Sequence, residues 1–111
     1  MKQNISIFDL SVVATAAIAS NTFVASGGVT ATAAGNALGV ADTSATIGQA
    51  VKVAVLGTAL VTAGGAIPAG SAVEVGVGGA AVVKAAGVTV ARALGTAVAA
   101  GDLIEVLLIA N

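Results

Sequence analysis

The segment from Ala66 to Val75 reads AIPAGSAVEV, and a matching segment from Ala97 to Val106 reads AVAAGDLIEV. In both, a glycine precedes a run in which apolar and polar residues partly alternate. Glycine permits a tight turn, and a period of two sends successive side chains to opposite faces of a strand. The two segments therefore predict short strands that are each entered through a glycine turn.

A third and looser copy, ATIGQAVKV, runs from Ala45 to Val53. The simplest interpretation is that small barrels commonly enter their strands in this way, and we favour it over an evolutionary duplication.

Turn signals recur at intervals of about eight to twelve residues, which is typical of short antiparallel strands. The valine-rich runs between them are the predicted strands: 49–56, 72–77, 80–84, 88–94 and 103–109. The 15 glycines argue against a helical bundle, since each interior glycine costs about 1 kcal/mol relative to alanine. Only Leu10–Ala19, rich in alanine and free of glycine, could form a helical turn. The predicted fold is all-β, a small single-domain β-barrel or β-tulip-like fold with at most one short N-terminal helix.

Residues 1–23 lie outside the repeated turn-strand pattern and are predicted to form an N-terminal arm or first strand, ahead of a β domain over residues 24–111. They contain both phenylalanines of the chain. Phe23 is expected in the core, whereas for Phe8 a core position and an exposed position on the arm remain open.

An apolar arm can add a strand to a neighbour's exposed sheet edge while an aromatic side chain fills a pocket. The candidate interface residues are therefore Ile5, Ile7, Phe8 and Leu10. Deleting Met1 to Leu10 is expected to leave the β domain folded and to abolish partner binding.

The composition points to assembly. Hydrophobic residues make up 58% of the 111 residues, whereas charged residues make up 8% and the net charge is −1. A soluble monomer usually has a surface with roughly 25–35% charged residues. Much of the surface should therefore be covered by other protein, including copies of the same chain in a dimer or trimer. No basic footprint for nucleic acid and no polybasic membrane patch is visible.

The sequence offers no catalytic constellation. It contains no His, Cys, Tyr or Trp, which removes most general bases and metal ligands, so no catalytic, cofactor or metal site is predicted. Asp102 and Glu105 should point to opposite faces of a strand. Glu74 could approach Glu105 across strands, but both are expected on a solvated face. The glycines of segment 76–79 lack the Lys-Ser/Thr of a phosphate loop and predict a hairpin turn.

Residues 53–73 carry no charge and are long enough to span a bilayer, but four glycines and Pro68 would interrupt a helix there. The N-terminus, with Lys2 before an apolar stretch, is similar to a secretory signal, yet Asp9 directly before that stretch favours an ordinary first strand or arm.

The order of these features resembles the capsid cement, or head decoration, proteins of tailed bacteriophages. The resembling segments are 37–41, 48–53, a turn at Gly57, 63–70, 91–95 and 100–108. The resemblance implies a small β-barrel-like protein that binds the outside of an assembled icosahedral shell and stabilises it. It also implies the major capsid protein as partner, no cofactor, and a location on the capsid exterior after assembly in the host cytoplasm.

Two other functions remain as alternatives. One is a membrane-active, holin-like small protein, which a helical circular dichroism spectrum would reveal. The other is a self-assembling surface-layer or fibre subunit, which would not purify with capsids.

Overall fold

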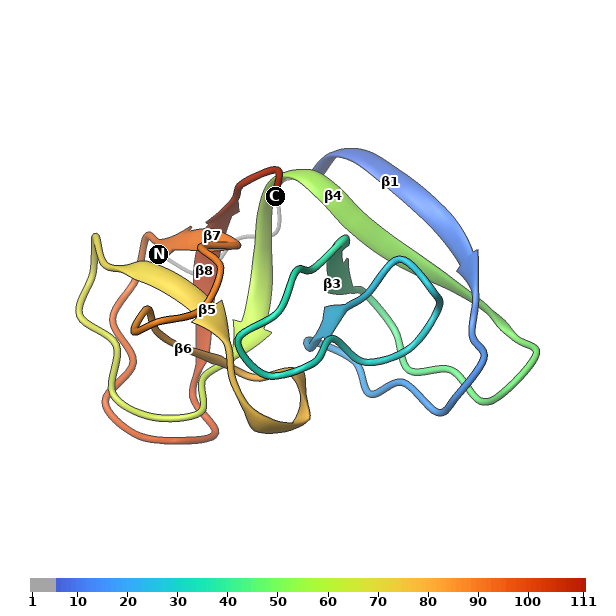
Figure 1. Cartoon of the computed structure of the whole chain (residues 1–111). Coiled ribbons are helices and arrows are strands. Elements are labelled where there is room, and N and C mark those ends of the chain that lie inside the picture. Colours follow the sequence, from blue (N-terminus) through green and yellow to red (C-terminus); the bar gives the residue numbers. More distant parts are fainter. Residues whose placement is uncertain (1–5) are drawn as a thin grey trace.

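The computed structural model describes residues 6–111, and the fold is all-β as predicted. Within this range the strands are β1 (Ser6–Val13), β2 (Phe23–Val24), β3 (Gly39–Ala41), β4 (Ala50–Thr62), β5 (Ala72–Val75), β6 (Ala81–Val83), β7 (Ala91–Ala93) and β8 (Leu103–Leu108). They form one sheet in the order β2-β3-β4-β8-β7-β5-β6, with β1 also paired to β4 (Figure 1). Every pairing between these strands is antiparallel.

The helical turn that the sequence allowed over Leu10–Ala19 does not form. Residues 10–13 are the second half of β1, where Val12 pairs with Val51 and Val13 with Ala50. Cross-strand pairing of β-branched side chains overrides the helix propensity of the alanines that follow. The short 3₁₀ turn η1 (Val77–Gly79) instead lies between β5 and β6, where the sequence predicted a hairpin turn.

Strand β4 is longer than predicted because the chain does not turn at Gly57. The strand continues through this residue, whose φ of 97° lies in the region that favours glycine. The register between β1 and β4 shifts nearby, between Ser6 and Phe8 and again between Phe8 and Asp9. Gly57 therefore supports an irregular, bulged stretch of β4 and not a reversal of the chain.

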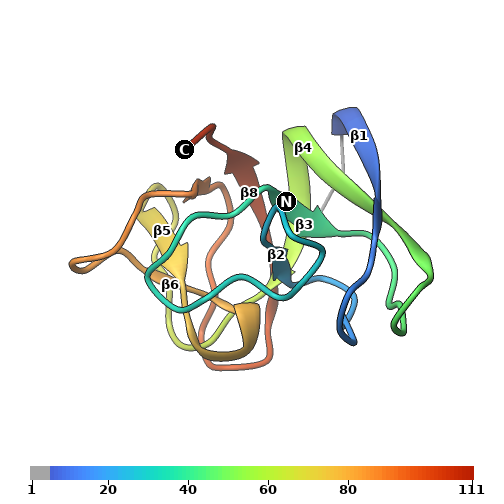
Figure 2. The ribbon, with the colours of Figure 1, turned by 45° about the vertical axis from the view of Figure 1, so that its right-hand side comes forward.

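Because β4 is so long, it joins two lobes. In the N-terminal lobe, β1 and β3 pair with its first half, and β2 pairs with β3. In the C-terminal lobe, β8 pairs with its second half, followed by β7, β5 and β6. A parallel bridge between Ala63 and Ala81 returns β6 to the end of β4, so the C-terminal strands form a nearly closed barrel (Figure 2).

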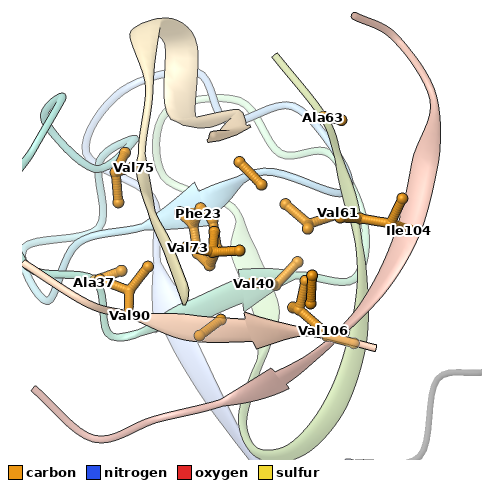
Figure 3. Close-up of a cluster of buried hydrophobic side chains, with 14 of the residues drawn as sticks. Phe23, Ala37, Val40, Val61, Ala63, Val73, Val75, Val90, Ile104 and Val106 are labelled. Carbon is orange, nitrogen blue, oxygen red and sulfur yellow. The ribbon is translucent and has the colours of Figure 1, made fainter. Parts of the chain in front are cut away.

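The larger hydrophobic core fills the C-terminal lobe and receives side chains from the N-terminal lobe as well. Phe23 and Val40 pack with Val61, Val73 and Ile104 (Figure 3). Phe23 is fully buried, as the sequence predicted. A smaller core holds the N-terminal lobe together: Ala14, Ile18, Val24, Ala41, Ala45, Val51 and Val53.

The turn-strand repeat occurs four times in the described structure, and the four copies are hydrogen-bonded to one another in two pairs. Ile18 and Ala45 form one antiparallel bridge, and Ile67 and Ala97 form the other. In each pair the two residues exchange both backbone hydrogen bonds, at 2.9 Å in the first pair and at 2.9 and 3.0 Å in the second. The copies therefore interlock two by two, one pair in each lobe.

A second set of hydrogen bonds repeats in the same way. In each copy the carbonyl of a buried alanine, four residues before the bridge, accepts from a positive-φ residue of the partner copy. The four bonds are Gly48 to Ala14, Asn21 to Ala41, Gly101 to Ala63 and Gly70 to Ala93, at 2.7–2.9 Å. The sequence did not reveal the copy around Ile18, because Asn21 (φ 59°) stands where the others have glycine.

Candidate protein-binding surface

The N-terminal strand places three of the four predicted interface residues within the described structure. Ile7 is 78% exposed and Phe8 is 50% exposed, so neither belongs to the core. Leu10 is half-buried, and Ile5 lies outside the described residues. The strand thus presents large apolar side chains to the outside of the molecule.

Strand pairing adds an apolar residue that the sequence analysis missed. Phe8 pairs with Leu56 of β4, which is 48% exposed, and Ile7 is the extra residue where the register first shifts. Directly opposite residues of an antiparallel pair share one face, so Phe8 and Leu56 form a continuous surface. We call Ile7, Phe8 and Leu56 the β1 patch. The sequence analysis could not find this surface, because it depends on the pairing of Phe8 with Leu56, two residues more than forty positions apart in the chain.

Charged groups flank the β1 patch. Lys52 Nζ on β4 lies 3.3 Å from Asp9 Oδ2 and 3.8 Å from Asp42 Oδ2. Such partly exposed ion pairs add little stability, but they fix charged groups beside an apolar surface. An apolar centre with a polar margin is the usual anatomy of a protein interface.

The outer edge of β1 is also open. Among the described strands β1 pairs only with β4, and β3 occupies the opposite edge of β4 because both partners contact Val53 and Ala54. An unpaired edge offers backbone N–H and C=O groups to another chain. Two residues of the β1 patch, Ile7 and Phe8, therefore lie on the same strand as this edge.

The expectation that Glu74 lies on a solvated face is wrong. The residue is buried, and its Oε1 accepts hydrogen bonds from the N–H groups of Ala85 (2.6 Å) and Gly87 (3.0 Å). Hydrogen bonding, chiefly from Ala85 and then from Gly87, lowers the pKa of Glu74; burial opposes this shift and Lys84 adds to it. Glu74 thus fastens the loop between β6 and β7.

Glu105 is also buried, with 1% of the residue exposed, so the same expectation is wrong for it. Strand β7 lies between β5 and β8, which separates Glu74 from Glu105. The two carboxylates are therefore not a cross-strand pair. Asp102 lies just before β8, where its Oδ2 accepts from the N–H groups of Val98 and Ala99.

The rest of the described structure offers surfaces and no enclosed site. Residues 6–111 contain no pocket, and no group of three or more acidic side chains lies close enough to hold a metal ion. No helix in this part of the chain is long and apolar enough to cross a membrane.

Comparison with known proteins agrees with this description. The family model of phage cement proteins matches residues 2–108. The chain belongs to the phage cement protein family. It is therefore a phage capsid-associated structural protein, a component of the virion. No curated protein matches it.

A solved structure shows that the fold of this cement protein recurs elsewhere. The chain is similar to the N-terminal base of the head fiber protein gp8.5 of bacteriophage phi29, with a TM-score of 0.74. Sequence identity is 18%, and the match covers 92% of this chain and 93% of the other. At this level of identity the likeness establishes the shared fold alone.

Proposed function

We propose that this cement protein binds the outer surface of the assembled phage capsid and stabilises it, with the β1 patch as its contact to the major capsid protein. Ile5 and Leu10 complete the contact. The observation that carries the proposal is the group of exposed apolar side chains on β1 and β4, beside an open sheet edge.

The energetics favour such a contact. Complete burial of a large apolar side chain contributes roughly 1.5–3 kcal/mol, and an added strand supplies backbone hydrogen bonds. A protein that binds the assembled shell, and not its free subunits, stabilises assembly by mass action. Capsid stabilisation therefore requires only that the surface contacted by the β1 patch be complete in the shell.

Self-association into a dimer or trimer belongs to the same proposal. Charged residues are only 8% of the chain, so much of its surface is poorly solvated and is expected to be buried against other protein chains. We expect the protein to assemble in the host cytoplasm and to remain on the capsid exterior. Light scattering of the purified protein should give two or three chains per particle, and a stable monomer at high concentration would contradict this part.

The test of the contact uses point variants. Residues 8–10 are paired with β4, so deleting Met1 to Leu10 would also disturb the sheet. Phe8→Ser combined with Leu56→Ser removes two of the three apolar side chains of the β1 patch, the pair that lies directly opposite across β1 and β4, and leaves the backbone in place. Val83→Ser, on β6 and 43% exposed, is the matched control. Co-sedimentation with empty shells should be lost in the double variant and kept in the control; equal binding by both would refute the proposed contact.

A further inference from the structure

The outer face of the C-terminal lobe carries a carboxylate at the centre of four leucines. Glu105 lies on β8, directly opposite Leu60 of β4. On its other side Leu94 continues the register of β7, and its N–H donates to the Glu105 carbonyl. Leu103 and Leu107 stand two residues away along β8 and share its face. We call these five residues the leucine–glutamate patch.

Glu105 lies in an apolar setting between the leucines of β4 and β8 and the leucine that directly follows β7. Its Oε1 is buried and has no hydrogen-bond partner in the described structure. A buried carboxylate oxygen without a donor is costly, and a leucine would fit this apolar setting better. Ile104 and Val106, the neighbours of Glu105 on β8, already supply the inner core. The acid is therefore unfavourable for the isolated fold, which is the pattern of a residue kept for binding.

The patch has the composition of a binding surface as well. Leu94 and Leu107 are both exposed, while Leu60 and Leu103 are half-buried. Arg92 pairs with Leu107 and, with its exposed side chain, contributes a charged margin. An apolar centre of this kind favours an anchor side chain that is fully desolvated on binding.

We propose that the leucine–glutamate patch receives a lysine or arginine side chain from a capsid subunit, which displaces Leu94 and Leu107 to reach the buried Glu105 and pair with it. This inference rests on the proposed function and adds to it a second contact, on the other lobe from the β1 patch. The partner's cation supplies the donor that Oε1 lacks, and the aliphatic part of its side chain packs against the leucines.

Charge complementarity favours a capsid subunit over a second copy of this chain. Two copies that met face to face at this patch would bring two Glu105 carboxylates together, which is repulsive. The described cations of the chain already have partners. Lys52 pairs with Asp9 and Asp42, Lys84 donates to the Ala85 carbonyl, and Arg92 donates to the Gly70 carbonyl.

The test compares two properties of the same variants, the melting temperature of the isolated protein and its co-sedimentation with empty shells. Glu105→Leu and Glu105→Gln remove the charge at the centre of the patch. Asp102→Asn is the control, since it removes a nearby exposed charge while its amide oxygen can still accept from Val98 and Ala99. We expect both Glu105 variants to melt at the same temperature as the wild type or higher, and to bind shells about tenfold more weakly or worse. The control should bind normally.

Three results would overturn the inference. Undiminished shell binding by Glu105→Leu would show that the patch is not a contact. A lower melting temperature for Glu105→Gln, matched by Lys2→Gln, would show that the donor is this chain's own Lys2, which lies outside the described residues. Wild-type protein that fails to co-sediment with shells would refute the proposed function itself, and the inference with it.

Discussion

The two lobes are built with the same paired turns but differ in how completely they close. In the C-terminal lobe a bridge between Ala63 and Ala81 connects β6 to the end of β4, and the larger core fills the interior of this lobe. In the N-terminal lobe β1 lies at an edge, and Ile7 and Phe8 face outwards. The C-terminal lobe therefore supplies much of the fold's stability, whereas the N-terminal lobe carries the β1 patch.

The comparison shows that the repeat and the binding surface are separate properties. Both turn pairs satisfy the backbone groups at the strand entries with equivalent hydrogen bonds. The exposed side chains differ between the lobes, because the backbone hydrogen bonds of the paired turns do not determine which side chains the strands expose.

The largest expected effect comes from the two phenylalanines. Phe23→Ala empties the core and should cost about 3–5 kcal/mol of unfolding free energy. Phe8→Ala, at a half-exposed position, should cost about 1 kcal/mol or less. Urea denaturation of both variants measures the difference directly. Equal losses would mean that Phe8 on the edge strand is as important for folding as Phe23 in the larger core.

Glu74 should give a smaller effect that depends on pH. Its pKa is lowered in the folded state, so its contribution is present above the unfolded pKa of about 4.3 and is lost as pH falls through the folded value. Glu74→Gln should therefore melt below the wild type at pH 7, and the two should converge in acid. A gap between wild type and Glu74→Gln that persists at pH 2 would contradict the hydrogen-bonded carboxylate.

The paired turns provide the smallest effect and test the equivalence of the lobes. Gly48 and Gly101 have φ near +90°, and an added Cβ would meet no atom within 4 Å at either. Replacement by alanine should therefore cost only backbone strain, about 1–2 kcal/mol, in both lobes. Gly27→Ala, which has the same open space and no positive φ, is the control. A cost in one lobe alone would show that the turns are not equivalent.

Local sequence patterns were sufficient to predict the all-β class, five strands and the buried position of Phe23. Alternating valines and glycine turns act over a few residues, so they can be recognised without the structure. The burial of Glu74 and Glu105, the passage of β4 through Gly57 and the pairing of Phe8 with Leu56 could not be predicted. Each depends on contacts between segments far apart in the chain, which the spacing of residues within one segment does not encode.

The central claim is that this protein binds the capsid through the β1 patch and thereby stabilises the capsid. The most direct test is the thermal melting of empty shells, measured alone, with saturating wild-type protein and with the Phe8→Ser, Leu56→Ser variant. The account predicts that the wild type raises the melting temperature of the shell and that the folded variant does not. A variant that protects the shell as well as the wild type would contradict it.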